Sequence, residues 1–136
     1  MTVLYNEARR KGYILLGTSN RSELMMGYFT KFGDGACDAM PIADLYKTQV
    51  RALAREIGIP EDVIEKPPTA GLWDGQTDEG DMGVEYAVLD VILEGIESGK
   101  DSASISEDLG VAIGDVQCIA QRVTEMAHKR SLPKRP

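Results

Sequence analysis

The segment YILLG, residues 13–17, is a compact run of apolar residues that ends in glycine. Such a run is typical of a buried strand in a parallel sheet. No other part of the sequence gives an equally clear strand pattern. One strand, or two at best, leaves backbone N–H and C=O groups unpaired at its edges, so we expect the rest of the sheet to come from polypeptide outside this sequence.

Helical patterns surround the predicted strand. Residues 2–11 form a short helix before it, and Asn20 with Glu23 has the spacing of a capping box. We expect the helix that this box opens to run to about Phe32. A further helix follows, with one apolar face made of Tyr46, Val50, Leu53 and Ile57.

The C-terminal half is predicted to be helices around one long loop. A single helical turn covers 60–65, and 66–83 is rich in Gly, Pro, Thr and Asp without any period, which indicates a surface loop. An apolar helix is expected at 84–96. The last helix ends near residues 128–130, before a basic, proline-broken tail at 131–136, and its apolar stripe is Val116, Ile119, Ala120, Val123 and Met126.

Length and composition limit the classes of protein to consider. The chain has 136 residues, which suits a single domain, with 43% apolar and 27% charged residues. A net charge of −7 repels nucleic acid and anionic membranes, and no apolar run is long enough to span a bilayer, so we expect a cytoplasmic protein without membrane or nucleic-acid partners. Cys37 and Cys118 match no zinc spacing, and a single histidine excludes multi-histidine metal sites.

Residues 102–123 are compatible with a helix-turn-helix, because two short helical patterns flank a glycine. The second of these patterns begins with Asp115 close to its N-terminus. A carboxylate at that place would face DNA phosphates with the wrong sign of charge. DNA binding is therefore the least favoured of the functions considered.

The stretch KFGDGACDAMPIADLYK, residues 31–47, has the composition of a polar ligand site. Lys31 and Asp38 bracket a glycine-containing loop that lets backbone approach a ligand, although a turn with solvated charges explains them too. Lys47 falls in the first turn of a helix, where the macrodipole disfavours a cation unless an anion binds there. The alternative is a surface lysine that points into solvent.

Several other residues allow both a functional and a structural interpretation. Glu23 is either only the capping-box partner or also a ligand for a hard cation such as Mg²⁺. Thr18 follows the predicted strand at the edge where open α/β sheets bind ligands, and Thr69 follows two prolines. His128 and Lys129 lie in the last turn of a helix, where the dipole favours cations whether or not a ligand binds.

The residues from 17 to 79, GTSNRSELMMGYFTKFGDGACDAMPIADLYKTQVRALAREIGIPEDVIEKPPTAGLWDGQTDE, closely resemble the ammonia-dependent NAD synthetases. The triplet HKR at 128–130 is similar to the C-terminal motif of that family. The resemblance implies an α/β fold with a doubly wound parallel sheet of the adenine-nucleotide alpha-hydrolase type, mostly helical in this portion. It also implies a ligase in which ATP and Mg²⁺ activate deamido-NAD as an adenylate, ammonia displaces AMP, and NAD and pyrophosphate are released.

The resemblance assigns roles position by position. Thr18, Lys47 and Thr69 are similar to residues that contact ATP, and Glu23 is similar to a magnesium ligand. The positions similar to deamido-NAD contacts are Lys31, Asp38, His128 and Lys129. No catalytic nucleophile or base is implied.

This sequence departs from the family pattern because it contains no SGGxDS pyrophosphate loop. We therefore expect residues 1–136 to be one domain that corresponds to the C-terminal portion of an NAD synthetase domain, with weak or no activity by itself. The alternative is a non-catalytic remnant that serves as a dimerisation or nucleotide-binding module. Family members resemble homodimers, and the helix at 84–96 has enough apolar surface for such an interface.

Overall fold

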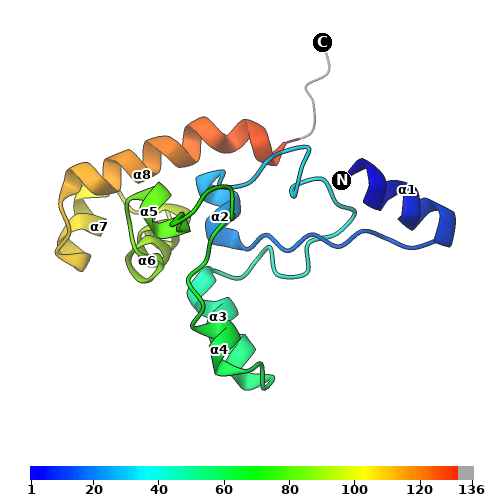
Figure 1. Ribbon diagram of the computed structural model, residues 1–136. Coiled ribbons are helices and arrows are strands. Elements are labelled where there is room, and N and C mark those ends of the chain that lie inside the picture. The colour runs from blue at the N-terminus through cyan, green and yellow to red at the C-terminus, as the bar shows by residue number, and fades with distance from the viewer. Residues whose placement is uncertain (132–136) are drawn as a thin grey trace, which may run out of the picture.

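The computed structural model describes residues 1–131, so most of the expected tail at 131–136 lies outside the described part. Figure 1 shows a body of helices with two projections, one formed by α3 and α4 and the other by α1. The described elements are α1 (Thr2–Lys11), α2 (Arg21–Met26), α3 (Lys47–Glu56), α4 (Glu61–Ile64), α5 (Asp78–Met82), α6 (Tyr86–Glu97), α7 (Ser102–Leu109), α8 (Ile113–Glu125) and the 3₁₀ helix η1 (Met126–Arg130).

The core is built around α6, the apolar helix that the sequence predicted at 84–96. Its buried side chains Tyr86, Leu89 and Leu93 pack with residues of α2, α7 and α8. Gly95 lets α7 approach, because a β-carbon there would lie 2.8 Å from Ile105 Cγ1. The central position of α6 brings α2 and α3 against the same helix, which sets the geometry of the polar residues described below.

The helix that begins at the Asn20–Glu23 capping box is shorter than predicted. The box itself is confirmed: Asn20 Oδ1 accepts from the Glu23 N–H at 3.0 Å, and Glu23 Oε2 accepts from the Asn20 N–H at 3.2 Å. The expected end near Phe32 is wrong, because Gly27 adopts a left-handed conformation (φ 64°) and ends α2 after Met26. Residues 28–46 are consequently irregular chain rather than helix.

Residues 13–17 are extended, but they are not buried as predicted. Leu15 O accepts from the Asp38 N–H at 2.8 Å, the Gly17 N–H donates to Ala39 O at 2.8 Å, and Leu16 and Ala39 form an isolated parallel bridge. The opposite edge is open, since the backbone groups of Ile14 and Leu16 bond to nothing in residues 1–131. The side chain of Ile14 is 69% exposed, so within this chain the segment is a half-paired edge and no sheet forms among the described residues.

The arm formed by α3 and α4 confirms two predicted helices and corrects the expected apolar face. α4 is the single turn predicted near 60–65, and α3 begins one residue after Tyr46. Leu53 and Ile57 on the predicted face are 42% and 65% exposed, because only the first part of α3 packs against α6. The apolar stripe is therefore real in the sequence but largely uncovered in this chain.

The C-terminal region contains more helix than predicted. The expected loop at 66–83 includes α5, which Thr77 caps by accepting from the Gly80 N–H. α7 and α8 are joined through Gly110 and lie side by side at one end of the body (Figure 1). None of the helices within residues 1–131 has the length and apolar character needed to cross a membrane.

The different burial of two leucines gives a direct test of where the core lies. Leu93→Ala in α6, where the side chain is fully buried, should lower the free energy of unfolding by about 2–5 kcal/mol. The matched change Leu53→Ala in α3 should cost less than about 1 kcal/mol, because that side chain is already half in water. Urea unfolding followed by circular dichroism measures both values, and equal losses would contradict the assignment of the core to α6.

Candidate functional site

Most of the residues singled out by sequence lie around α2. On one side Glu23 pairs with Lys47, which begins α3 and lines a groove between α3 and α4. On the other side Arg21 and Leu24 line a second groove beneath η1. These are called the α3–α4 groove and the α2–η1 groove below.

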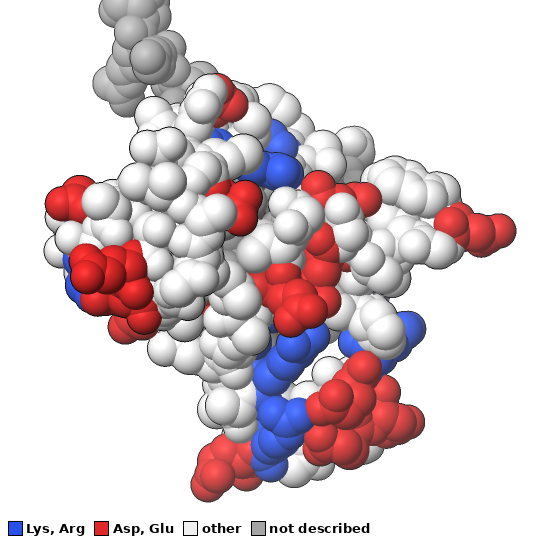
Figure 2. Space-filling view, turned by 90° about the vertical axis from the view of Figure 1, so that its left-hand side faces the viewer, with Lys and Arg blue, Asp and Glu red and all other residues white. Residues whose placement is uncertain are grey.

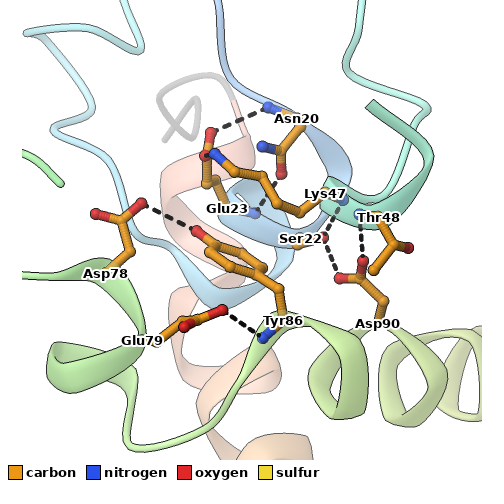
Figure 3. Close-up of polar contacts among 9 residues, drawn as sticks. All are labelled: Asn20, Ser22, Glu23, Lys47, Thr48, Asp78, Glu79, Tyr86 and Asp90. Atoms are coloured by element: carbon orange, nitrogen blue, oxygen red, sulfur yellow. Dashed lines mark hydrogen bonds and ion pairs between the residues drawn. The ribbon is translucent and has the colours of Figure 1, made fainter. Parts of the chain in front are cut away.

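Glu23 and Lys47 form an ion pair across the junction of α2 and α3. Lys47 Nζ donates to Glu23 Oε1 at 2.9 Å, and the two side chains are only 19% and 15% exposed. The other oxygen of Glu23 serves the capping box, so the structural interpretation of this carboxylate is confirmed, and its use as a magnesium ligand stays a prediction. Figure 3 shows the lysine reaching over Tyr86, with Nζ 5.2 Å from the ring centroid.

The N-terminus of α3 is occupied by protein groups, which corrects the idea of a free anion site there. The Lys47 N–H donates to Ser22 Oγ at 2.9 Å, and the Thr48 N–H donates to Asp90 Oδ2 at 2.8 Å. Ser22 Oγ in turn donates to Asp90 Oδ1 at 2.5 Å, as Figure 3 shows. Because Asp90 supplies the negative charge at the positive helix end, the unfavourable position of Lys47 needs no bound ligand to explain it.

Tyr86 links this pair to the chain before α6. Its hydroxyl donates to Asp78 Oδ2 at 3.1 Å, and its backbone N–H donates to Glu79 Oε1 at 3.1 Å (Figure 3). Burial, followed by the nearby carboxylates of Glu23 and Asp78, raises the pKa of Tyr86 far above its usual value. Asp78 Oδ1 is buried and accepts no hydrogen bond from residues 1–131, which leaves one acceptor near the pair unsatisfied.

The α3–α4 groove brings Thr69 to the same place as Lys47. The groove has a volume of about 390 Å³. Its floor is apolar, and its polar lining consists of Lys47, Arg51, Lys66 and Thr69. Two of the three residues that the resemblance assigns to ATP therefore line one groove.

The α2–η1 groove holds two of the residues assigned to deamido-NAD. It has a volume of about 470 Å³, and both Lys31 and Lys129 line it. Lys31 Nζ donates to the carbonyls of His128 and Ser131 at 2.6 and 2.7 Å, which joins the loop after α2 to η1. Lys129 Nζ donates to the carbonyls of Gly27 and Phe29 at 2.7 and 2.9 Å, so both cations are anchored on backbone.

Asp38 lies beside the α2–η1 groove rather than in its lining. Its Oδ2 accepts from the Leu15 N–H at 2.7 Å, which fixes the middle of the irregular segment 28–46 to the extended residues 13–17. Tyr5 of α1 lines the groove and lies next to this carboxylate. The pKa of Tyr5 is raised, first by desolvation and then by the charge of Asp38.

Thr18 and His128 are not brought into either groove. Thr18 is exposed in the link between the Leu16 bridge and α2, and its side chain makes no hydrogen bond within residues 1–131. The imidazole of His128 is exposed and bonds through Nδ1 to the Glu125 carbonyl at 2.9 Å. Only the backbone carbonyl of His128 contacts a residue of the α2–η1 groove, because it accepts a hydrogen bond from Lys31 Nζ.

The sequence-based predictions did not include the residues around the Glu23–Lys47 ion pair and its groove. Asp90 is a charged residue within an otherwise apolar helix, which is a usable signal because buried carboxylates require partners. Ser22 carries no such signal, since it looks like any other residue in a first helical turn. Arg51 falls one turn after Lys47 on the same helix face, so its place in the groove follows from helical spacing once the function of Lys47 is suspected.

A divalent cation would have few protein ligands here. Within residues 1–131 no group of three or more His, Cys, Asp or Glu side chains has the arrangement of a metal site. Glu23 is a single carboxylate with one oxygen already shared with Lys47. Magnesium commonly binds through one or two carboxylates together with substrate phosphates, so Glu23 fits Mg²⁺ only when a phosphate ligand completes the set.

Comparison with known proteins identifies relatives along the whole described chain. Residues 1–133 match the family model described as NAD synthase. The chain is 48% identical to the "NH(3)-dependent NAD(+) synthetase" of Pyrococcus horikoshii and 46% identical to the protein of that name from Methanococcoides burtonii, covering 100% and 98% of this chain but 53% and 51% of those proteins. The solved structure "NMN synthetase from Francisella tularensis" superposes with a TM-score of 0.82 at 39% identity, over 99% of this chain and 51% of that one. The chain thus spans about half the length of the curated relatives it matches.

The raised pKa of Tyr86 predicts how stability depends on alkaline pH. Above pH 10 the unfolded chain loses the Tyr86 proton while the folded chain keeps it, so the free energy of unfolding should fall by about 1.4 kcal/mol per pH unit from this group alone. Tyr86→Phe removes the titrating hydroxyl and keeps the ring. Urea unfolding between about pH 9 and 11 should therefore give the variant a shallower loss of stability than the wild type, and parallel curves would show that the hydroxyl titrates alike in both states.

Proposed function

The chain belongs to the NAD synthase family, and from this premise we propose that it supplies the part of an ammonia-dependent NAD synthetase that holds ATP in the α3–α4 groove and deamido-NAD in the α2–η1 groove. The reaction is an ATP-dependent amidation. The nicotinate carboxylate of deamido-NAD attacks the α-phosphorus of ATP, forming an adenylate and releasing pyrophosphate, and ammonia then displaces AMP to give NAD. The enzyme is thus a ligase that forms a C–N bond.

The observation that carries this proposal is the connection of two grooves through one short helix. Glu23 of α2 pairs with Lys47, which lines the α3–α4 groove, and Leu24 of α2 lines the α2–η1 groove. Each groove contains cations, although the chain as a whole carries a charge of −7. Two anionic substrates held in grooves that are fixed to each other through the Glu23–Lys47 pair suit a reaction that depends on positioning.

On the ATP side, Lys47 and Thr69 bind phosphate oxygens, and Thr18, which precedes the N-terminus of α2, contacts the nucleotide. Lys47 already holds Glu23, so it is rigid before ATP arrives and loses little side-chain entropy on binding. Glu23 would hold Mg²⁺ together with those phosphates. The ion, when bound, would supply positive charge against the charge that develops on the phosphates.

On the dinucleotide side, Lys31, Asp38, His128 and Lys129 bind deamido-NAD. Lys31 and Lys129 now donate to backbone carbonyls at the rim of the groove, which directs their charge toward it without leaving either ammonium free to move. Asp38 is a hydrogen-bond acceptor suited to ribose hydroxyls. His128 would turn from its exposed position to contact the ligand.

The finer architecture also belongs to this proposal. Residues 13–17 are proposed as one strand of a doubly wound parallel sheet of the adenine-nucleotide alpha-hydrolase type, because their single bridge is parallel and their outer edge is unpaired. The remaining strands would come from the half of the relatives' length that this chain does not cover. A homodimer in the cytoplasm is the proposed assembled form.

The alternative is a non-catalytic nucleotide-binding or dimerisation module that keeps both grooves but not the chemistry. Residues 1–136 contain no SGGxDS loop, and that motif is expected to hold the pyrophosphate of ATP. The 136-residue chain should therefore bind both substrates and show weak or no formation of NAD. Ordinary ammonia- and ATP-dependent turnover by this chain would contradict that expectation.

Substitutions on the two sides of α2 should separate the two ligands. Lys31→Met should weaken deamido-NAD binding about tenfold and leave ATP binding within about twofold, because one charge-assisted hydrogen bond is lost in only one groove. Lys47→Met should weaken ATP binding about tenfold and leave deamido-NAD binding within about twofold, for the same reason. Isothermal titration with each ligand measures both effects, at a temperature where circular dichroism shows each variant to be folded.

The same titrations test the choice of substrate. The Francisella relative is described as an NMN synthetase, so the mononucleotide counterpart of deamido-NAD is the matched competitor. Preference for the dinucleotide supports the function proposed here. Binding of neither nucleotide, or identical responses of both variants to both ligands, would refute the assignment of one groove to each substrate.

A further inference from the structure

Most of the basic side chains in the described chain are already bonded to protein. Arg21 and Lys100 pair with carboxylates, and Lys31, Arg122, Lys129 and Arg130 donate to backbone carbonyls. Arg10, Lys11, Lys47 and Arg55 pair with glutamates. Among residues 1–131 this leaves Arg9, Arg51 and Lys66 without a hydrogen bond or ion pair.

Two of these three unbonded cations line the same groove. Arg51 lies one turn after Lys47 on α3, and Lys66 begins the segment that leads from α4 to Thr69. Figure 2 shows Lys and Arg side chains gathered over the α3–α4 arm at the bottom of the view, beside acidic ones. Two of the acidic residues of the arm, Glu61 and Glu65, share Arg55 as their partner.

Arg51 and Lys66 line one groove without a carboxylate partner in the described chain, although the sequence offers enough acids to neutralise them. The sequence has 22 acidic and 15 basic residues, yet no carboxylate lies within ion-pair distance of Arg51 or Lys66 in the described chain. Such an arrangement is favourable when an anion with several charges binds between them. The guanidinium of Arg51 matches two phosphate oxygens at once, whereas Lys66 supplies a point charge.

We propose that Arg51 and Lys66 bind the triphosphate of ATP in the α3–α4 groove, next to Lys47 and Thr69. This inference rests on the proposed function, because it identifies which residues hold the phosphates of one substrate. Lys47 is committed to Glu23, so its single ammonium has only part of its capacity left for a triphosphate. Arg51 and Lys66 supply the charge that this commitment removes.

The apolar floor of the groove strengthens the expected effect of these two charges. Val50, Ala54 and Ile64 line the groove beneath the cations and exclude water from one side of any bound phosphate. An ion pair against such a surface is screened less than one surrounded by solvent. Arg51 is partly buried and Lys66 is exposed, so Arg51 should contribute more.

Titration of the 136-residue chain with inorganic tripolyphosphate tests the proposal without any nucleoside. Arg51→Met should weaken tripolyphosphate binding about tenfold, and Lys66→Met about three- to fivefold, because each removes a charge-assisted contact. Arg51→Lys should restore part of the loss. Arg9→Met is the matched control, since it removes an equally unbonded cation from α1, outside the groove, and should change binding by less than about twofold.

The outcomes are distinct. Weaker tripolyphosphate binding by Arg51→Met and Lys66→Met, with little change in Arg9→Met, supports the proposal. The same order of effects on ATP binding would support the placement of the ATP phosphates in this groove. Equal losses in all three variants would indicate only a general charge effect and would overturn it, as would absence of tripolyphosphate binding by the wild type. The proposal would also be overturned if adenosine displaced tripolyphosphate from the chain while Arg51→Met left tripolyphosphate binding unchanged.

The experiment separates this inference from the proposed function. Tripolyphosphate is not a substrate of the ligase, so its binding does not depend on formation of NAD or on deamido-NAD. Failure of the wild type to bind deamido-NAD would remove the synthetase assignment and leave a polyphosphate groove. Retained binding of both substrates with no effect of Arg51→Met or Lys66→Met would remove only the inference.

Discussion

The carboxylate of Asp90 is only 4% exposed, and it accepts hydrogen bonds from two different elements. Ser22 of α2 donates to one oxygen and the Thr48 N–H of α3 donates to the other. A buried carboxylate is tolerated only when such partners satisfy it, so α2 and α3 are held at fixed positions against α6. The ion pair of Glu23 and Lys47 forms because each residue is a neighbour of one of these two anchors in the sequence.

This arrangement explains how the described residues, which form helices and a single isolated bridge, can still present an organised polar site. α2 is only six residues long, and its ends are fixed by the capping box and by Gly27. Its residues Arg21 and Leu24 line the α2–η1 groove, and its Glu23 holds Lys47 of the α3–α4 groove. Lys31 and Lys129 are held by backbone carbonyls. The rigid parts of the site thus depend on contacts within the described chain, whereas the outer edge of 13–17 has none.

Local features of the site could be predicted from the sequence, and long-range ones could not. The capping box and the helices at 47–56 and 86–97 follow from capping residues and apolar spacing, which act over a few residues. The early end of α2 also has a local cause in Gly27, which sequence analysis overlooked in favour of the continuing pattern. The exposure of Ile14 and Leu53 depends on what packs against them, and Ser22 gains its importance only from Asp90, 68 positions away.

The central claim is that Asp90 sets the start of α3 and thereby places Lys47 beside Glu23. Amide hydrogen exchange measured by NMR tests it most directly, because the Lys47 and Thr48 N–H groups are the donors in question. In Asp90→Asn these two amides should exchange at least about tenfold faster than in the wild type, while the amides of α8 keep their protection. Unchanged exchange at Lys47 and Thr48 in a folded variant would contradict the account.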